Sequence, residues 1–114
     1  MTVVVTEDKA LTTLAPDGPL ERELGESLEQ NVEESLERGR DRFLLNIQRV
    51  PHARSAGLES IVRIARRIAD IGGRLAIIGA NEVVTDILRA TRLDRRLAVF
   101  DSTEAAMYSM TSEG

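Results

Sequence analysis

The residues with the clearest chemical potential are Ser55-Ala56-Gly57-Leu58, which follow an apolar stretch at residues 43–50 and open an amphipathic helix. The N-terminus of a helix has unpaired N–H groups and a partial positive charge, so the main chain would hold a phosphate on Ser55. Serine is also a preferred N-cap residue, and the same hydroxyl could serve only to satisfy a helix amide. Both roles are compatible with this position.

Other patterns that could support catalysis are weak. His52 precedes Ser55 by three residues, but nucleophilic catalysis also needs a third group to orient the base. Gly72-Gly73 lacks the Lys-Ser or Lys-Thr of a phosphate-binding loop and is expected to end a helix. With one His and no Cys, metal-ligand spacing is absent. We expect a non-enzymatic protein without catalytic residues, metal or cofactor.

The composition predicts a single domain over residues 1–114, with 42% hydrophobic and 30% charged residues. The lack of Cys fits a reducing compartment, and no apolar run approaches the roughly 20 residues of a membrane span. The N-terminus also lacks the pattern of a signal peptide, so a cytoplasmic location without membrane insertion is expected. A net charge of −4 and few aromatic residues disfavour nucleic acid as a partner.

Charge is unevenly distributed along the chain. Residues 21–37 contain seven Glu and one Arg, whereas residues 54–96 contain nine Arg and five acidic residues. We interpret both mainly as solvated helix faces, including the Arg63, Arg66 and Arg67 face, with a docking surface as the alternative.

Apolar spacing predicts alternating strands and helices. Strands are expected at residues 2–6, 11–14, 43–47, 75–78 and 97–100, and helices at residues 20–39 and 55–71, from Asn81 onward and after Asp101. Asn81 is a candidate N-cap, and Asp101 with Glu104 has the spacing of reciprocal capping. This order implies a mainly parallel sheet, with the turn at Gly18, the Ser55 junction and residues 79–81 converging at the carboxyl ends of the strands.

From Val3 to about Met110, the chain resembles the STAS domain family, specifically the small free-standing anti-sigma factor antagonists. The resemblance depends on four segments and their order: Gly18-Pro19-Leu20-Glu21, Ser55-Ala56-Gly57-Leu58, Ile71-Gly72-Gly73-Arg74-Leu75 and Phe100-Asp101-Ser102-Thr103-Glu104-Ala105-Ala106. It implies an α/β fold with a mixed, mainly parallel sheet of about five strands and about four helices.

The resemblance also implies a partner switch. In such proteins the serine matched by Ser55 is phosphorylated by a serine kinase that is also the anti-sigma factor, and a phosphatase reverses the modification. The unphosphorylated form binds the anti-sigma factor and thereby frees a sigma factor. A phosphate adds about −1.5 to −2 charges, which would expel a partner fitted to a bare hydroxyl. The implied partner-binding residues are Glu21, Arg54, Ala56, Gly57, Leu58 and Asn81, on a monomer or weak dimer.

Three residues depart from the family pattern. Arg54 and Asn46 stand where acidic residues are usual, and Glu21 stands where Asp is usual. Arg54 could pair with a phosphate on Ser55, or contact an acidic partner while Ser55 stays unmodified.

Two alternative functions remain open. One is a constitutive, unphosphorylated STAS scaffold in a signalling or transport complex, and the other is a small enzyme or nucleotide binder at the sheet edge.

Overall fold

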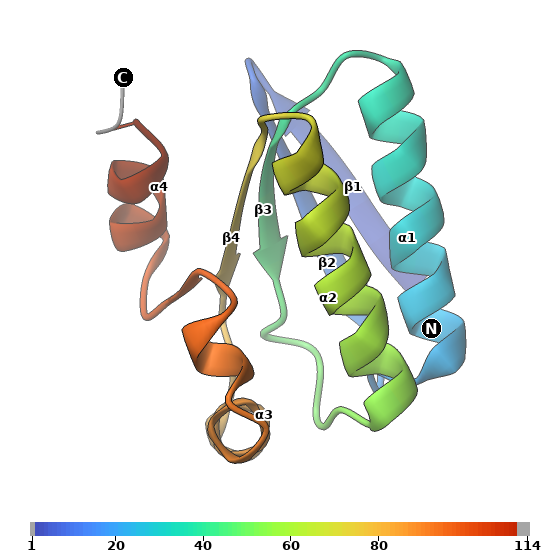
Figure 1. Cartoon of the computed structure of the whole chain (residues 1–114), viewed down its shortest axis with the longest axis vertical. Coiled ribbons are helices and arrows are strands. Elements are labelled where there is room, and N and C mark those ends of the chain that lie inside the picture. Colours follow the sequence, from blue (N-terminus) through green and yellow to red (C-terminus); the bar gives the residue numbers. More distant parts are fainter. Residues whose placement is uncertain (1, 112–114) are drawn as a thin grey trace.

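The computed structural model describes residues 2–111 and forms one five-stranded sheet with helices against both faces (Figure 1). The elements in chain order are β1 (Thr2–Asp8), β2 (Leu11–Asp17), α1 (Arg22–Glu37), β3 (Arg42–Asn46), α2 (Ser55–Asp70), β4 (Arg74–Ile78), α3 (Glu82–Ala90), a 3-10 turn (Leu93–Arg95), β5 (Val99–Phe100) and α4 (Thr103–Thr111). The predicted α/β class is confirmed.

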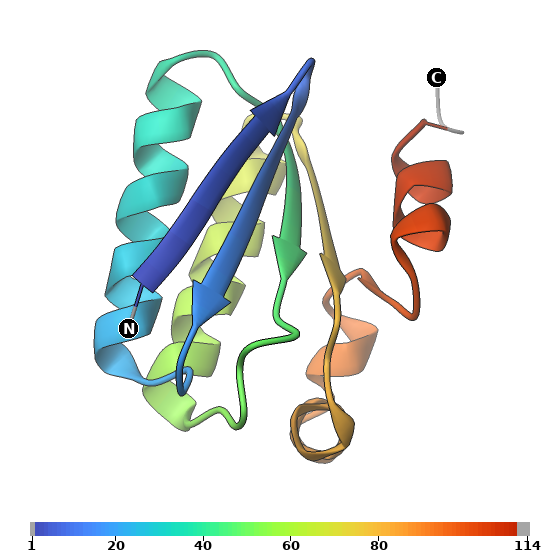
Figure 2. The same ribbon diagram turned by 180° about the vertical axis from the view of Figure 1, so that it is seen from behind.

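The order of strands in the sheet is the same as their order in the chain, β1-β2-β3-β4-β5. β1 pairs antiparallel with β2, and the other three pairs are parallel, as the sequence predicted. β-helix-β crossovers are right-handed. When each new strand is added at the same edge of the sheet, the crossover helices therefore lie on one face. α1 and α2 lie there side by side, whereas α4 packs on the other face (Figure 2).

Alternation along β3 explains the two cores. Phe43 and Leu45 are buried against α1 and α2 in the larger cluster, and Leu44 between them is buried against α4 in a smaller one. Successive side chains of a strand point to opposite faces, so a strand covered on both sides is continuously apolar. The central position predicted for this strand is therefore confirmed.

Most predicted helix ends are confirmed. Gly39 and Gly72, with φ of +83° and +76°, follow the last turns of α1 and α2, a conformation that glycine adopts without strain. Asn81 caps α3, because its side chain accepts the Val84 N–H at 2.8 Å. β3 ends at Asn46, so residues 47–54 form a loop rather than the end of a strand.

Two residues considered as candidate caps, Ser55 and Asp101, do not occupy the N-cap positions. The N-cap position of α2 is Arg54, and Ser55 is the first helical residue. The chain stays extended up to Arg54 because the Arg54 N–H donates to the Leu20 carbonyl at 2.9 Å. At α4, the Ser102 hydroxyl accepts the Ala105 N–H at 3.1 Å, so Ser102 rather than Asp101 is the capping residue and Glu104 is not three residues beyond it.

Candidate functional site

Three loops meet at the carboxyl ends of β3 and β4, as the sequence predicted. The turn before α1 is joined to the β3–α2 loop by backbone hydrogen bonds from the Gly18 N–H to the Arg49 carbonyl (3.2 Å) and from the Leu20 N–H to the His52 carbonyl (2.9 Å). Leu20 and Ala53 form a parallel bridge. These bonds hold the chain that leads into α2 against the start of α1.

The third loop, at the end of β4, is attached to the same segment. The Asn81 side-chain amide donates to the carbonyls of Val50 and Pro51, both at 3.2 Å, while its oxygen caps α3. Gly79 has a φ of +86°, and a Cβ there would lie 2.7 Å from the Asn46 side-chain oxygen. That oxygen accepts the Gln48 N–H at 3.1 Å. Hydrogen bonds donated by the exposed Asn81 and accepted by the half-buried Asn46 therefore fix the β3–α2 loop.

Ser55 lies exposed at the rim of this surface, at the first position of α2. Its hydroxyl makes no hydrogen bond with any residue of the 2–111 range. The first hydrogen bond of the helix runs from the Leu58 N–H to the Arg54 carbonyl, so three N–H groups precede it at the N-terminus. An exposed, unbonded hydroxyl beside these donors is accessible to a modifying enzyme, and a phosphate on it would be stabilised by them.

Arg54 and Glu21 form an ion pair next to Ser55. The Arg54 Nε lies 3.0 Å from a Glu21 carboxylate oxygen, and the two side chains are 73% and 42% exposed. Exposed pairs of this kind add little stability. Their effect is local: the pair links the starts of α1 and α2 and places a guanidinium and a carboxylate on the same surface as the serine.

Ala56, Gly57 and Leu58 occupy different depths. Ala56 is half-buried, whereas Gly57 and Leu58 are buried, Leu58 being 8% exposed. A Cβ on Gly57 would lie only 2.2 Å from the Leu20 carbonyl oxygen, so the residue must be glycine for α2 to approach that strand bridge. In this structure Gly57 and Leu58 support the surface from below.

Contacts between α1 and α2 were missed by the sequence interpretation. Arg63 makes two hydrogen bonds to the Glu29 carboxylate (2.9 and 3.1 Å), and Arg67 pairs with Glu33 at 2.8 Å. Both Glu and both Arg are four residues apart, a spacing that could have indicated facing helices. Two glutamates of α1 therefore form ion pairs with Arg63 and Arg67, two of the three arginines in the face that was predicted to be solvated.

The Glu29 carboxylate is held in its charged form. The hydrogen bond from Arg63 lowers the pKa of Glu29 below its ordinary value of 4.5; burial opposes this shift, and the hydrogen bond from Ser60 adds to it.

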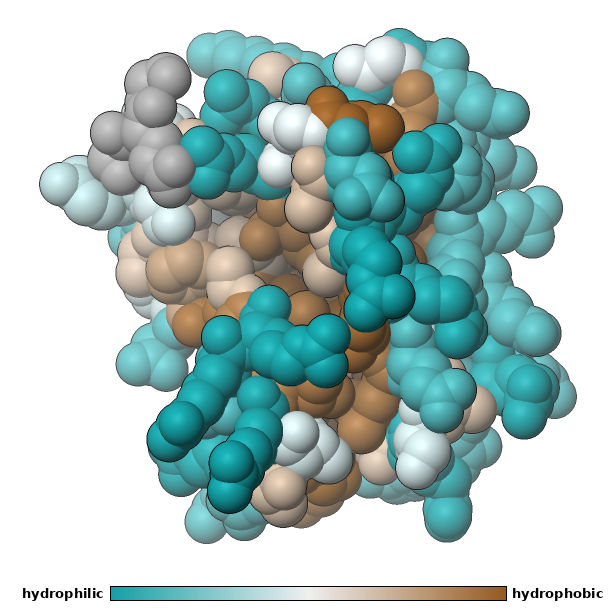
Figure 3. All heavy atoms as spheres, viewed as in Figure 1, coloured by the Kyte–Doolittle hydropathy of each residue, from teal (hydrophilic) through white to brown (hydrophobic). Residues whose placement is uncertain are grey.

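Arg66 takes no part in these ion pairs and lies at the edge of a shallow cleft of about 240 Å³ that also borders Arg96 and Leu97. Figure 3 shows apolar side chains in the hollow beside α2 and hydrophilic ones over α1.

Polar and apolar side chains surround the exposed serine of this surface. No group of His, Cys, Asp or Glu within residues 2–111 is arranged to hold a metal ion. Over the same residues, no helix has the length and apolarity that a bilayer crossing requires. His52 is half-buried next to the serine and uses its backbone carbonyl to bind Leu20. Fold and site together define a small α/β domain with an exposed serine at a helix N-terminus.

The comparison with protein families shows the family to which this domain belongs. The model of the STAS domain matches residues 2–106, so the chain belongs to the STAS domain family. The resemblance inferred from the sequence segments is thereby confirmed.

Relatives and solved structures agree with this family. A Thermotoga neapolitana protein, provisionally named an anti-sigma factor antagonist, is 32% identical over 75 residues, 66% of each protein. The crystal structure of a Thermotoga maritima protein with the same provisional name has a TM-score of 0.86 at 27% identity, covering 95% of this chain and 93% of that one. Phosphorylated SpoIIAA of Bacillus shares the fold, with a TM-score of 0.71 at 14% identity over 95% and 97% of the chains.

Proposed function

We propose that this protein is an anti-sigma factor antagonist that binds an anti-sigma factor with serine kinase activity and thereby frees a sigma factor. The names of the relatives support this class. Phosphorylation of Ser55 ends the interaction, and a phosphatase restores it. The observation that carries the proposal is the exposed Ser55 hydroxyl, free of hydrogen bonds to residues 2–111, at the N-terminus of α2 on a surface built by three loops.

The partner-binding surface comprises the exposed or half-buried residues around that serine, Glu21, Arg54, Ala56 and Asn81, supported by Gly57 and Leu58. A phosphate placed among them adds charge and bulk where the partner would lie. The three N–H groups at the start of α2 stabilise that phosphate, so the modified form needs no rearrangement of the fold.

The decisive experiment incubates the protein with ATP and each candidate anti-sigma factor kinase of the same genome, followed by mass spectrometry. Phosphate is expected on Ser55 and absent from Ser60, which is 1% exposed and donates to Glu29. In calorimetric titrations, Ser55→Asp is expected to weaken partner binding at least about tenfold. Ser55→Ala is expected to bind like the unmodified protein and to resist release by ATP.

A constitutive scaffold is the second candidate function. It is favoured by Arg54, which places a cation beside the serine where the family resemblance implies an acidic residue, and which is already engaged by Glu21 at 3.0 Å. Tight binding of a partner without any labelling of Ser55, and with equal affinity for Ser55→Asp, would support this second function and exclude the switch.

A further inference from the structure

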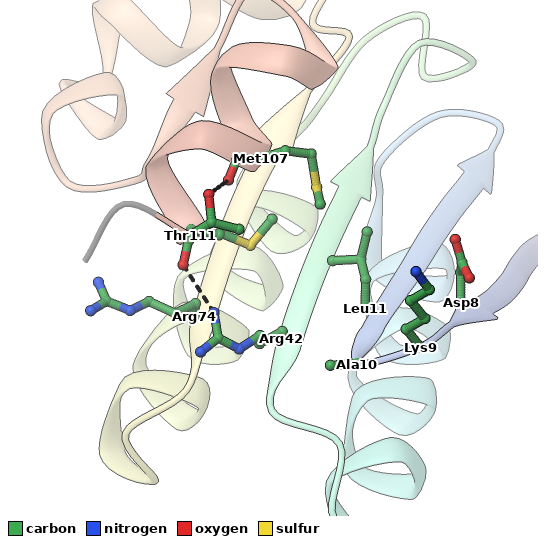
Figure 4. A pocket seen from close by; sticks show the side chains of 9 residues that line it. Asp8, Lys9, Ala10, Leu11, Arg42, Arg74, Met107 and Thr111 are labelled. Atoms are coloured by element: carbon green, nitrogen blue, oxygen red, sulfur yellow. Dashed lines mark hydrogen bonds between the residues drawn. The ribbon is translucent and has the colours of Figure 1, made fainter. Parts of the chain in front are cut away.

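A second cleft, of about 570 Å³, lies at the opposite end of the sheet from Ser55. It opens between the turn that joins β1 and β2 and the helix α4, above the first residue of β3 (Figure 4). Its volume falls within the range of about 300–1,000 Å³ that is usual for small-molecule sites. The proposed switch uses none of its residues.

Both walls of the cleft are fixed by arginines. Arg40 donates to the Lys9 carbonyl (2.8 Å), the Leu11 carbonyl (2.9 Å) and the Thr12 hydroxyl (2.9 Å), which together hold the hairpin wall. On the other side, Arg42 donates to the Met110 carbonyl in the last turn of α4 at 2.9 Å. The cleft therefore exists without a ligand, which lowers the ordering cost of binding one.

The lining combines charged groups with apolar surface. Among the described residues, Lys9, Arg42 and Arg74 contribute cationic side chains to the lining, and Asp8 contributes a carboxylate. Leu11 from β2 and the thioether side chain of Met107 from α4 face the space between the walls (Figure 4). Met110, which is 5% exposed, also lines the cleft. Methionine side chains adapt to ligands of varied shape.

We propose that this cleft binds a small amphipathic anion, with a carboxylate or phosphate headgroup near Lys9 and Arg42 and an alkyl chain against Leu11, Met107 and Met110. The guanidinium of Arg42 has further N–H donors beyond the one used on Met110. The cations select the charge of the headgroup, and the two methionines and Leu11 bury the chain. This inference is independent of the proposed partner switch.

The test is a titration of the isotope-labelled full-length protein, followed by NMR, with decanoate and decyl phosphate below their micelle concentrations. Shift changes are expected at residues 8–11, 42 and 107–111, and the tighter of the two probes identifies the headgroup. Decanol, which has the chain without the charge, is expected to bind at least tenfold more weakly. Equal binding of decanol, changes centred elsewhere, or binding to anionic vesicles alone would overturn the proposal.

Two variants separate the headgroup from the chain without touching the core. Lys9→Asn suits the left-handed backbone at this position (φ +56°) and is expected to raise the Kd of decanoate about threefold. Ala10→Phe fills the cleft from an exposed position and is expected to raise the Kd at least tenfold. Arg66→Gln, an exposed cation outside the cleft, is the control and should leave the Kd unchanged. Unchanged affinity in both cleft variants would exclude the site.

Discussion

At the scale of single residues, Ser55 and Asn81 lie at the starts of neighbouring helices but contribute differently to stability. Asn81 accepts a helix N–H and donates to two loop carbonyls, whereas Ser55 accepts none within residues 2–111. We therefore expect Asn81→Ala to lower the free energy of unfolding by about 0.5–2 kcal/mol, and Ser55→Ala to change it by less than about 0.5 kcal/mol. Urea unfolding measures both, and a loss of more than 1 kcal/mol for Ser55→Ala would show that the serine is structural.

Gly57 is predicted to be the least substitutable residue of the site. Because Gly57 has no side chain, α2 can pack closely on the backbone of Leu20. An ideal Cβ at this position would lie 2.2 Å from the Leu20 carbonyl oxygen, and that backbone cannot move aside as a side chain can. Gly57→Ala is expected to lower the free energy of unfolding by about 1–3 kcal/mol. Thermal or urea unfolding alongside Ser55→Ala, in the same helical turn, checks this, and equal stability of the two variants would contradict it.

At the scale of elements, the Glu29–Arg63 pair predicts a pH dependence of the α1–α2 packing. The pKa of Glu29 is lowered by the hydrogen bond from Arg63, so the unfolded chain binds a proton at higher pH than the folded one. The resulting stabilisation is present above the ordinary value of 4.5 and is lost as the pH falls through the lowered pKa.

Glu29→Gln should therefore lose less stability than the unmodified protein between pH 6 and pH 3, as measured by urea unfolding at each pH. Glu34→Gln, an exposed position of the same helix without an ion pair inside residues 2–111, is the matched control and should keep the original pH profile. Identical profiles for all three proteins would contradict a lowered Glu29 pKa.

The elements themselves were largely predictable, because apolar spacing reports directly which face of a helix or strand is buried. The convergence of three loops also followed, since parallel strands place their carboxyl ends at one edge. Cap residues were less predictable, because the tertiary hydrogen bond from the Arg54 N–H to the Leu20 carbonyl determines where α2 begins, and no local signal at Ser55 encodes it. The cleft between the β1–β2 turn and α4 was not predicted, because its lining combines residues from both ends of the chain, such as Lys9 and Met107.

At the scale of the whole molecule, the surface around Ser55 and the cleft between the β1–β2 turn and α4 lie at opposite ends of the sheet. We expect phosphorylation of Ser55 to change backbone NMR shifts mainly in residues 17–21, 46–58 and 79–82, and to leave α4 and the radius of gyration unchanged. This follows because the phosphate is accommodated by existing N–H groups. Shift changes that extend across α4 would instead indicate a global conformational change.

The sequential strand order also has a consequence for biosynthesis. Within residues 2–111, each strand after β1 pairs with the strand synthesised just before it. Pairing between consecutive strands closes shorter loops than pairing between distant strands would, and each strand can be added as the polypeptide leaves the ribosome. The hairpin of β1 and β2 would form first, and each later helix and strand would be added to an edge already present.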